Sequence, residues 1–220
     1  MDTDTALANR LARDVDAAFP DLVIAHQDRL YTIALRLLGD RRDAEEVAQD
    51  ALVRAYRAIG GYPRERVVAL RLRPWLASIA VNLARNRRRR FEDRQPPNQL
   101  EPMVDAGFDP ASDDGRGAPA LAADRRETQR ELASALLLLS PAVRVAIVLR
   151  HVDGLSVAEC AEALDRPEGT IKAQVHRGLK ELRALLEAPL DADAASDPPT
   201  TDHRSIARAA SPQPAMEAIR

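Results

Sequence analysis

Along most of this chain, apolar residues recur every three or four positions, which is the spacing of one face of an α-helix. The clearest stripe lies in segment 43–59 and consists of Ala44, Val47, Ala48, Ala51, Leu52, Ala55 and Ile59. The outer face of this predicted helix is mainly acidic and consists of Asp43, Glu45, Glu46, Gln49, Asp50 and Arg54. No segment shows the alternation of apolar and polar residues that is typical of β-strands.

A second amphipathic helix is predicted after an arginine-rich loop or weakly helical connection, GYPRERVVALRLRP. Gly60, Gly61 and Pro63 end the first helix, and Pro74 suits the first turn of the next, PWLASIAVNLARNRRRR, because a proline there leaves no backbone hydrogen bond unmade. The inward face carries Trp75, Leu76, Ile79, Ala80 and Leu83. The asparagines and arginines project outward, so the helix ends in a strongly basic segment.

Residues 155–183 predict two short helices joined by a tight turn, the arrangement of a helix-turn-helix. Ser156 and Glu159 have the spacing of a capping box, and Pro167 suits the first position of the second helix, after a turn at Asp165 and Arg166. The inward stripes are formed by Val157, Cys160, Ala161 and Leu164 and by Ile171, Val175, Leu179 and Leu182. The other face of the second helix presents donors that can reach phosphates and base edges in a major groove.

The periodic segments form two helical blocks, at residues 18–91 and 124–187, and an extension of residues 1–17 precedes them. Residues 92–123 contain prolines, glycines and aspartates with few spaced apolar residues, which predicts an extended, flexible acidic linker. Residues 188–220 predict a disordered tail. The expected fold is all-α, with two small helical domains joined by this linker.

The formal net charge is only −2, but the charged residues are unevenly distributed along the chain. The segment Arg85–Arg90 is densely basic, whereas Asp40–Asp50 and Glu101–Asp114 are acidic. This asymmetry predicts that one face meets nucleic acid and another face meets a different partner. The single cysteine, Cys160, lies on an apolar stripe and is expected in the core. The N-terminal sequence MDTDTALANR lacks the features of a signal peptide, and no apolar run has membrane length. We therefore expect a soluble, cytoplasmic protein without membrane insertion.

Three segments resemble, in order and spacing, the two domains of the extracytoplasmic-function (ECF, group 4) sigma-70 factors. They are DAEEVAQDALVRAYRAI, RPWLASIAVNLARNRRRR and LSPAVRVAIVLRHVDGLSVAECAEALDRPEGTIKAQVHRGLKELR. The resemblance covers most of residues 22–186, and the linker is too short for the middle domain of larger sigma factors. It implies a region 2 domain, a region 4 helix-turn-helix domain, and a function in promoter-specific transcription initiation with core RNA polymerase. An anti-sigma factor is a further candidate partner.

The resemblance also assigns candidate residues to three surfaces. The acidic helix would dock on the clamp helices of the polymerase largest subunit through Asp43, Glu46, Gln49, Asp50 and Arg54. The second helix would open and read the promoter around −10, with Asn82, Arg85 and Asn86 at bases and Arg87, Arg88, Arg89 and Arg90 at phosphates. The helix-turn-helix would read the −35 duplex with Lys172, Gln174, His176 and Arg177, flanked by backbone contacts from Thr170 and Lys180.

Two positions depart from the family pattern. Gln174 stands where members often have arginine, so we expect the preferred base to shift from guanine toward adenine, which glutamine binds bidentately. Asp165 occupies a turn position where glycine is frequent, and aspartate tolerates the left-handed backbone better than most residues do.

Other classes of function fit less of the chain. A helix-turn-helix regulator of the response-regulator output type accounts for residues 124–186 but leaves the acidic and basic helices of the first block unexplained. An enzyme is disfavoured because His26, His151, His176 and His203 lie far apart, and no phosphate-binding loop or nucleophile motif occurs. We expect no catalytic residue, no metal and no cofactor, since the catalytic step belongs to the polymerase.

Overall fold

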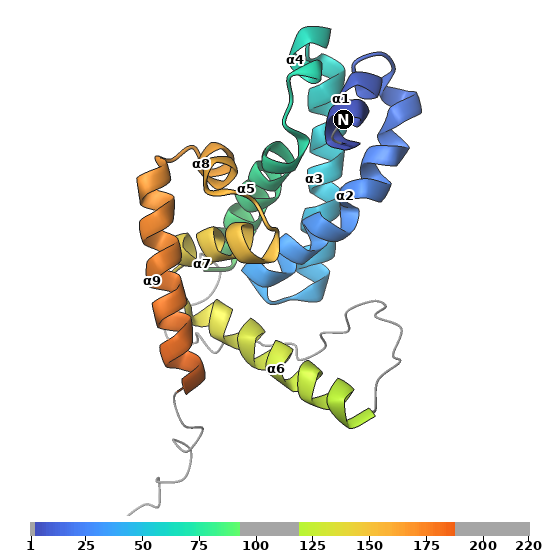
Figure 1. The fold of residues 1–220 in the computed structure, drawn as a ribbon. Helices are drawn as coiled ribbons and strands as arrows, with labels where there is room; N and C mark the ends of the chain where they lie inside the picture. Colours follow the sequence, from blue (N-terminus) through green and yellow to red (C-terminus); the bar gives the residue numbers. More distant parts are fainter. Residues whose placement is uncertain (1–2, 93–118, 188–220) are drawn as a thin grey trace, which may run out of the picture. The chain divides into compact units, whose positions relative to one another are not determined.

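The computed structural model describes residues 3–92 and 119–187, and the secondary structure of these residues is helical throughout (Figure 1). The first half contains α1 (Thr3–Leu11), α2 (Val15–Leu38), α3 (Arg41–Gly61), α4 (Arg64–Val68) and α5 (Leu72–Glu92). The second half contains α6 (Pro119–Leu138), α7 (Pro141–Ile147), the π-helical turn η1 (Val148–Val152), α8 (Val157–Leu164) and α9 (Glu168–Glu187).

The expected all-α fold is confirmed for the described residues. None of their helices is both long and apolar enough to cross a membrane. The predictions for the greater part of the linker, residues 93–118, and for the tail after residue 187 lie outside the described residues. Helix α6 begins at Pro119, inside the stretch that the sequence pattern assigns to the linker.

Side chains at the helix ends determine where α2 and α3 begin and turn. The Asp14 carboxylate accepts a hydrogen bond from the Ala17 amide at 3.0 Å, and Asp40 accepts from the Asp43 amide at 2.7 Å. Each carboxylate satisfies an amide that has no partner within its own helix. Gly39, with φ of 79°, ends α2 in the left-handed conformation and lets the chain reverse into α3.

Helices α2, α3 and α5 pack together around the apolar stripe predicted for residues 43–59. The alanines of this stripe, with Val47 and Ile59, are buried as expected, whereas Leu52 is only partly buried. The prediction that Asp43 lies on the outer face is wrong, because the residue is only 9% exposed. Its carboxylate is buried because Arg87 of α5 folds over α3 and binds it.

Helix α5 begins at Leu72, two residues before the predicted start at Pro74. Of its inward positions, Leu76, Ala80 and Leu83 are buried. Trp75 and Ile79 are only partly buried, against the expectation of a core tryptophan. The indole lies at the edge of the core beside Tyr62, with ring centroids 6.3 Å apart.

The helix-turn-helix forms as predicted, by α8 and α9. Both hydrogen bonds of the capping box are present, since the Glu159 amide donates to the Ser156 hydroxyl and the Ser156 amide donates to the Glu159 carboxylate. Asp165 has φ of 49°, so it adopts the left-handed turn conformation in which glycine is frequent. Cys160 is buried, and this burial raises the pKa of its thiol to about 11.

The prediction that Leu179 belongs to the inward apolar stripe of α9 is wrong, because this side chain is 47% exposed. Its neighbour Gly178 is buried instead and brings α9 close to α7. Sequence periodicity missed this contact because a glycine contributes no apolar side chain to a helical stripe.

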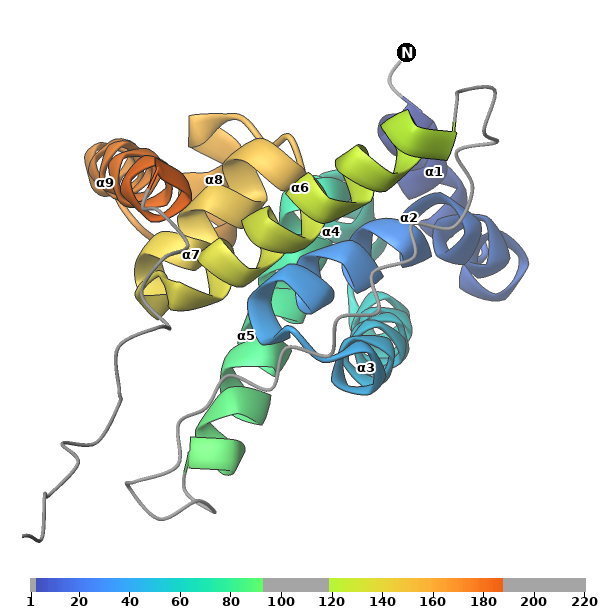
Figure 2. The same ribbon diagram turned by 90° about the horizontal axis from the view of Figure 1, so that it is seen from below.

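The two halves pack on each other within one compact unit that contains all the described residues. Val145, Val148, Leu149 and Leu155 of the second half belong to the same buried cluster as the apolar residues of α1, α2, α3 and α5. Helix α6 lies along α2, and α8 packs on α5 (Figure 2). The sequence pattern predicted two separate domains and gave no sign of this packing.

The close approach of α7 and α9 can be tested at Gly178. A β-carbon there would lie 2.6 Å from Cγ1 of Ile147 and 2.7 Å from Cγ1 of Val143. We expect Gly178→Ala to lower the free energy of unfolding by about 1–3 kcal/mol, because this overpacking outweighs a gain in helix propensity of at most about 1 kcal/mol.

Gly169→Ala is the matched control in the same helix, because nothing lies within 4 Å of its added carbon. This control should keep or slightly raise stability. Urea unfolding followed by circular dichroism measures both variants, and equal stabilities would contradict the close packing of α7 and α9.

Candidate nucleic-acid interface

The exposed surface of α5 presents a polar and basic row. Asn82, Asn86 and Arg89 are all exposed, and their spacing of three and four residues places them on one side of the helix. Arg90 is exposed beside them at the end of the helix. Four of the seven predicted −10 contacts are therefore accessible to a ligand.

Arg87 is engaged within the protein. Its guanidinium donates to the Asp43 carboxylate at 2.9 and 2.5 Å and to the Glu46 carboxylate at 2.5 Å. These bonds raise the pKa of Arg87 and hold the pKa of Glu46 below its ordinary value. The structure thus joins two predicted sets, because a candidate phosphate contact on α5 binds two candidate polymerase contacts on α3.

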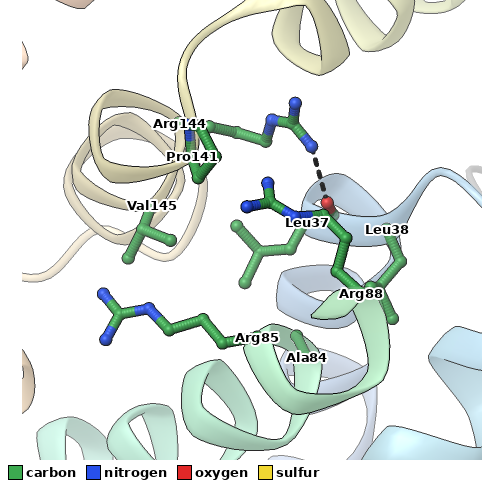
Figure 3. Close-up of a pocket in the computed structure, with 8 residues that line it drawn as sticks. All are labelled: Leu37, Leu38, Ala84, Arg85, Arg88, Pro141, Arg144 and Val145. Atoms are coloured by element: carbon green, nitrogen blue, oxygen red, sulfur yellow. Dashed lines mark hydrogen bonds between the residues drawn. The ribbon is translucent and has the colours of Figure 1, made fainter. Parts of the chain in front are cut away.

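Arg85 and Arg88 lie on the side of α5 that faces the second half (Figure 3). Together with Arg144 of α7 they line a cavity of about 20 Å³, which has room for little more than one water molecule. Burial, together with the charge of Arg88, lowers the pKa values of Arg85 and Arg144, the latter to about 10. Both helices therefore contribute positive charge to one confined space.

The outer face of α3 is polar and carries charges of both signs, because Arg42 and Arg57 are exposed beside its carboxylates. Glu45, Gln49, Asp50 and Arg54 are exposed there. Glu46 is half-buried, and its carboxylate also lies 3.5 Å from the Arg42 guanidinium, on the preceding turn of the same helix. Of the five predicted polymerase contacts, Gln49, Asp50 and Arg54 remain the most accessible.

Helix α9 exposes a polar and cationic side away from its packed residues. The exposed members of the predicted −35 set are Thr170, Lys172, His176, Arg177 and Lys180. Lys172 lies 3.5 Å from Glu168, but both side chains are more than half exposed, so this pair leaves the ammonium available.

Gln174 differs from the rest of the predicted −35 set. Its side chain is half-buried, and its amide oxygen is buried without a hydrogen-bond partner. A buried acceptor without a donor is costly, and the side chain must turn outward before this oxygen can meet a ligand.

The residues described by the structure contain no cluster of three or more His, Cys, Asp or Glu side chains that could hold a metal ion. The contacts that sequence analysis missed join the two halves. They include the bonds from Arg29 to Asp153 and from Arg144 to Leu37, whose partners are more than 100 residues apart. No local motif could reveal partners so distant in sequence.

Comparison with family models matches both halves of the chain. Residues 22–95 match sigma-70 region 2, and residues 129–182 match sigma-70 region 4. The ECF RNA polymerase sigma factor SigW of Bacillus subtilis (strain 168) is 34% identical over 175 residues, which are 77% of this chain and 89% of SigW.

Two solved structures are similar over most of the chain. One is CnrH in complex with the cytosolic domain of CnrY, at 26% identity and a TM-score of 0.59, covering 84% of this chain and 97% of CnrH. The other is the sigma factor RpoE in complex with the anti-sigma factor NepR from Bartonella quintana, at 25% identity and a TM-score of 0.59. This match covers 77% of the present chain and 97% of the solved one.

A helical region 2 followed by a helix-turn-helix region 4 defines a sigma-70 type transcription-initiation factor. More narrowly, the chain belongs to the ECF group of this family. It therefore directs promoter-specific initiation by RNA polymerase.

Proposed function

We propose that the chain divides promoter recognition among three helices, with α3 binding core polymerase, α5 opening and reading the −10 element, and α9 reading the −35 duplex. The observation that carries this assignment is the distribution of exposed side chains, since α3 presents Glu45, Gln49 and Asp50 beside arginines whereas α5 and α9 expose mainly cations and amides. In this proposal, residues 18–91 and 124–187 act as the two domains and residues 92–123 join them.

On α3, the accessible residues Gln49, Asp50 and Arg54 are the centre of the proposed polymerase contact. Asp43 and Glu46 act mainly by holding Arg87 and so fixing α5 against α3. In this contact the carboxylate of Asp50 complements a basic group of the partner, which favours correct orientation.

On α5, the exposed Asn82 and Asn86 can bond to the edges of unpaired bases, whereas Arg89 and Arg90 lie where they can meet phosphates. On α9, Lys172, Gln174 and Arg177 lie in the part of a recognition helix that meets base edges. His176 completes the proposed base-contact set, and Thr170 and Lys180 flank it.

We further propose that the protein performs no catalysis of its own, acts in the cytoplasm and binds an anti-sigma protein. The last point is supported by the similar structure of RpoE, which is bound to the anti-sigma factor NepR.

In vitro transcription tests the function directly. Purified core polymerase supplemented with this chain should initiate at defined start sites on a library of genomic promoters, whereas core enzyme alone should not. A helix-turn-helix regulator cannot program core enzyme by itself, so an inactive mixture containing folded protein would contradict the proposed function.

The polymerase surface can be tested by charge reversal. Gln49→Arg with Asp50→Arg should weaken binding to core polymerase roughly tenfold or more, because like charges then face each other across the interface. The matched control changes the exposed pair Gln27→Arg and Asp28→Arg on α2, which has the same residue types. Fluorescence titration with core enzyme measures both, and equal affinities would remove α3 from the interface.

The phosphate contacts of α5 can be tested by salt dependence. Arg89→Gln with Arg90→Gln should reduce the slope of log affinity against log salt by roughly 0.7 per lost phosphate contact on single-stranded DNA, without changing sequence preference. The comparison is made with holoenzyme on one promoter at several salt concentrations. An unchanged slope would mean that these arginines meet solvent only.

The −35 assignment can be tested at Gln174. Gln174→Arg should shift preference from adenine toward guanine at one or two adjacent −35 positions, since a good bidentate contact contributes about 1–3 kcal/mol of discrimination. Lys180→Gln is the control and should weaken binding without altering preference. Transcription of a randomised −35 library measures both, and identical preferences for wild type and Gln174→Arg would place base reading elsewhere on α9.

A further inference from the structure

Helix α1 lies before the segment that matches region 2, yet it packs as part of the first half. The match covers residues 22–95, whereas α1 spans Thr3–Leu11. Its residues Leu7, Ala8 and Leu11 are buried, and the helix packs on α2 and α4 (Figure 1) and also on α5. Three helices therefore share a packing partner to which neither the family match nor the proposed function assigns a role.

Helix α4, in the connection that leads from α3 into α5, has little to hold it in place by itself. It has five residues, Arg64–Val68, and its N-cap Pro63 supplies no side-chain hydrogen bond. Of the five residues only Val67 is buried. A helix this short is not stable in isolation, so its conformation depends on packing. Among the described helices, α4 packs chiefly on α1, which is therefore its main support.

The first turn of α1 also faces the residues between α4 and α5. A cavity of about 370 Å³ there is lined by Asp4, Thr5, residues 70–74 and Glu159 of α8. On the side of α2, Oδ1 of Asp4 lies 3.5 Å from Nε2 of the buried His26. The beginning of α1 therefore lies between α2 and the connection, so α1 borders this connection at its start as well as through α4.

We propose that α1 is a positioning element for −10 recognition, which holds α4 and the residues leading into α5 in the orientation that meets promoter DNA. This role rests on the proposed function of α5. The connection exposes Arg64 and Arg66, and α5 exposes Asn82 and Asn86. Groups that bind DNA do so more tightly when they are ordered beforehand, because ordering a loose segment on binding costs affinity. Leu11 is only 1% exposed, so it acts through α4 and α5 without touching DNA.

The support of α4 by α1 is tested by hydrogen exchange in the full chain. The amides of Arg66, Val67, Ala69 and Leu70 donate backbone hydrogen bonds within the connection, so their exchange reports its order. Ala6→Gly weakens α1 at an exposed position without removing a packed side chain. It should speed exchange of these amides roughly fivefold, which corresponds to the loss of about 1 kcal/mol for a glycine inside a helix.

The matched control is Ala25→Gly, the same substitution at an exposed position of α2. It should leave the exchange of residues 66–70 as in the wild type. Equal exchange rates of these amides in the two glycine variants would overturn the support of α4 by α1.

The positioning role is tested with holoenzyme on two DNA fragments, a single strand carrying the −10 element and a duplex carrying only the −35 element. If the ordered fraction of the connection falls to about a tenth, Leu11→Ala should weaken binding of the single strand roughly tenfold. Binding of the −35 duplex should not change. Leu11→Met keeps most of the apolar volume and should bind both fragments as the wild type does. Ala6→Gly, which leaves the core intact, should show a smaller loss on the single strand alone.

Circular dichroism identifies the variants that retain their helices, and Ala6→Gly decides the question if Leu11→Ala fails to fold. Unchanged binding of the −10 strand in the folded variants, or equal losses on both DNA fragments, would overturn the positioning role. If the wild-type holoenzyme itself did not bind the −10 strand, the proposed function of α5 would be wrong, and the exchange comparison would still decide whether α1 supports α4. The two failures are therefore distinguishable.

Discussion

One buried cation, Arg144, holds the ends of two helices to α7. Its guanidinium donates to the backbone oxygens of Leu37 at 2.8 Å and Leu139 at 3.1 Å, and also to that of Leu137. Carbonyl groups at the end of a helix lack partners within it and carry the negative end of the helix dipole, so a cation satisfies them well. Because the side chain is only 8% exposed, water has little access to replace these bonds. The packing of the second half on α2 depends on this contact.

Local signals in the sequence predicted the helices over 43–59, 74–90 and 155–183, but they did not identify α1 or α2 and were insufficient for contacts between helices. The Ser156 capping box and the left-handed Asp165 depend on residues within a few positions of each other, so they could be predicted. Burial of Asp43 and exposure of Leu179 depend on partners from other helices, namely Arg87 and the face that α7 covers around Gly178. Helical periodicity describes the face of an isolated helix and contains no information about such partners.

The same limit applies to the candidate site. Residue types and spacing placed amides and cations on α5 and α9, and most of these side chains are exposed. Arg87 differs because its charge is used within the protein to join α3 to α5. The surface proposed to bind polymerase and the surface proposed to bind promoter therefore lie on two helices that are joined by an ion pair. A movement of α3 would act directly on α5 through this pair.

The buried thiol of Cys160 has a consequence for oxidative signalling. Burial raises the pKa of this thiol to about 11 and so keeps it protonated at neutral pH, whereas the thiolate is the form that reacts with peroxides. The chain contains no other cysteine. Cys160 is therefore a poor target for oxidants, and its place in the fold is that of an apolar core residue under the helix-turn-helix.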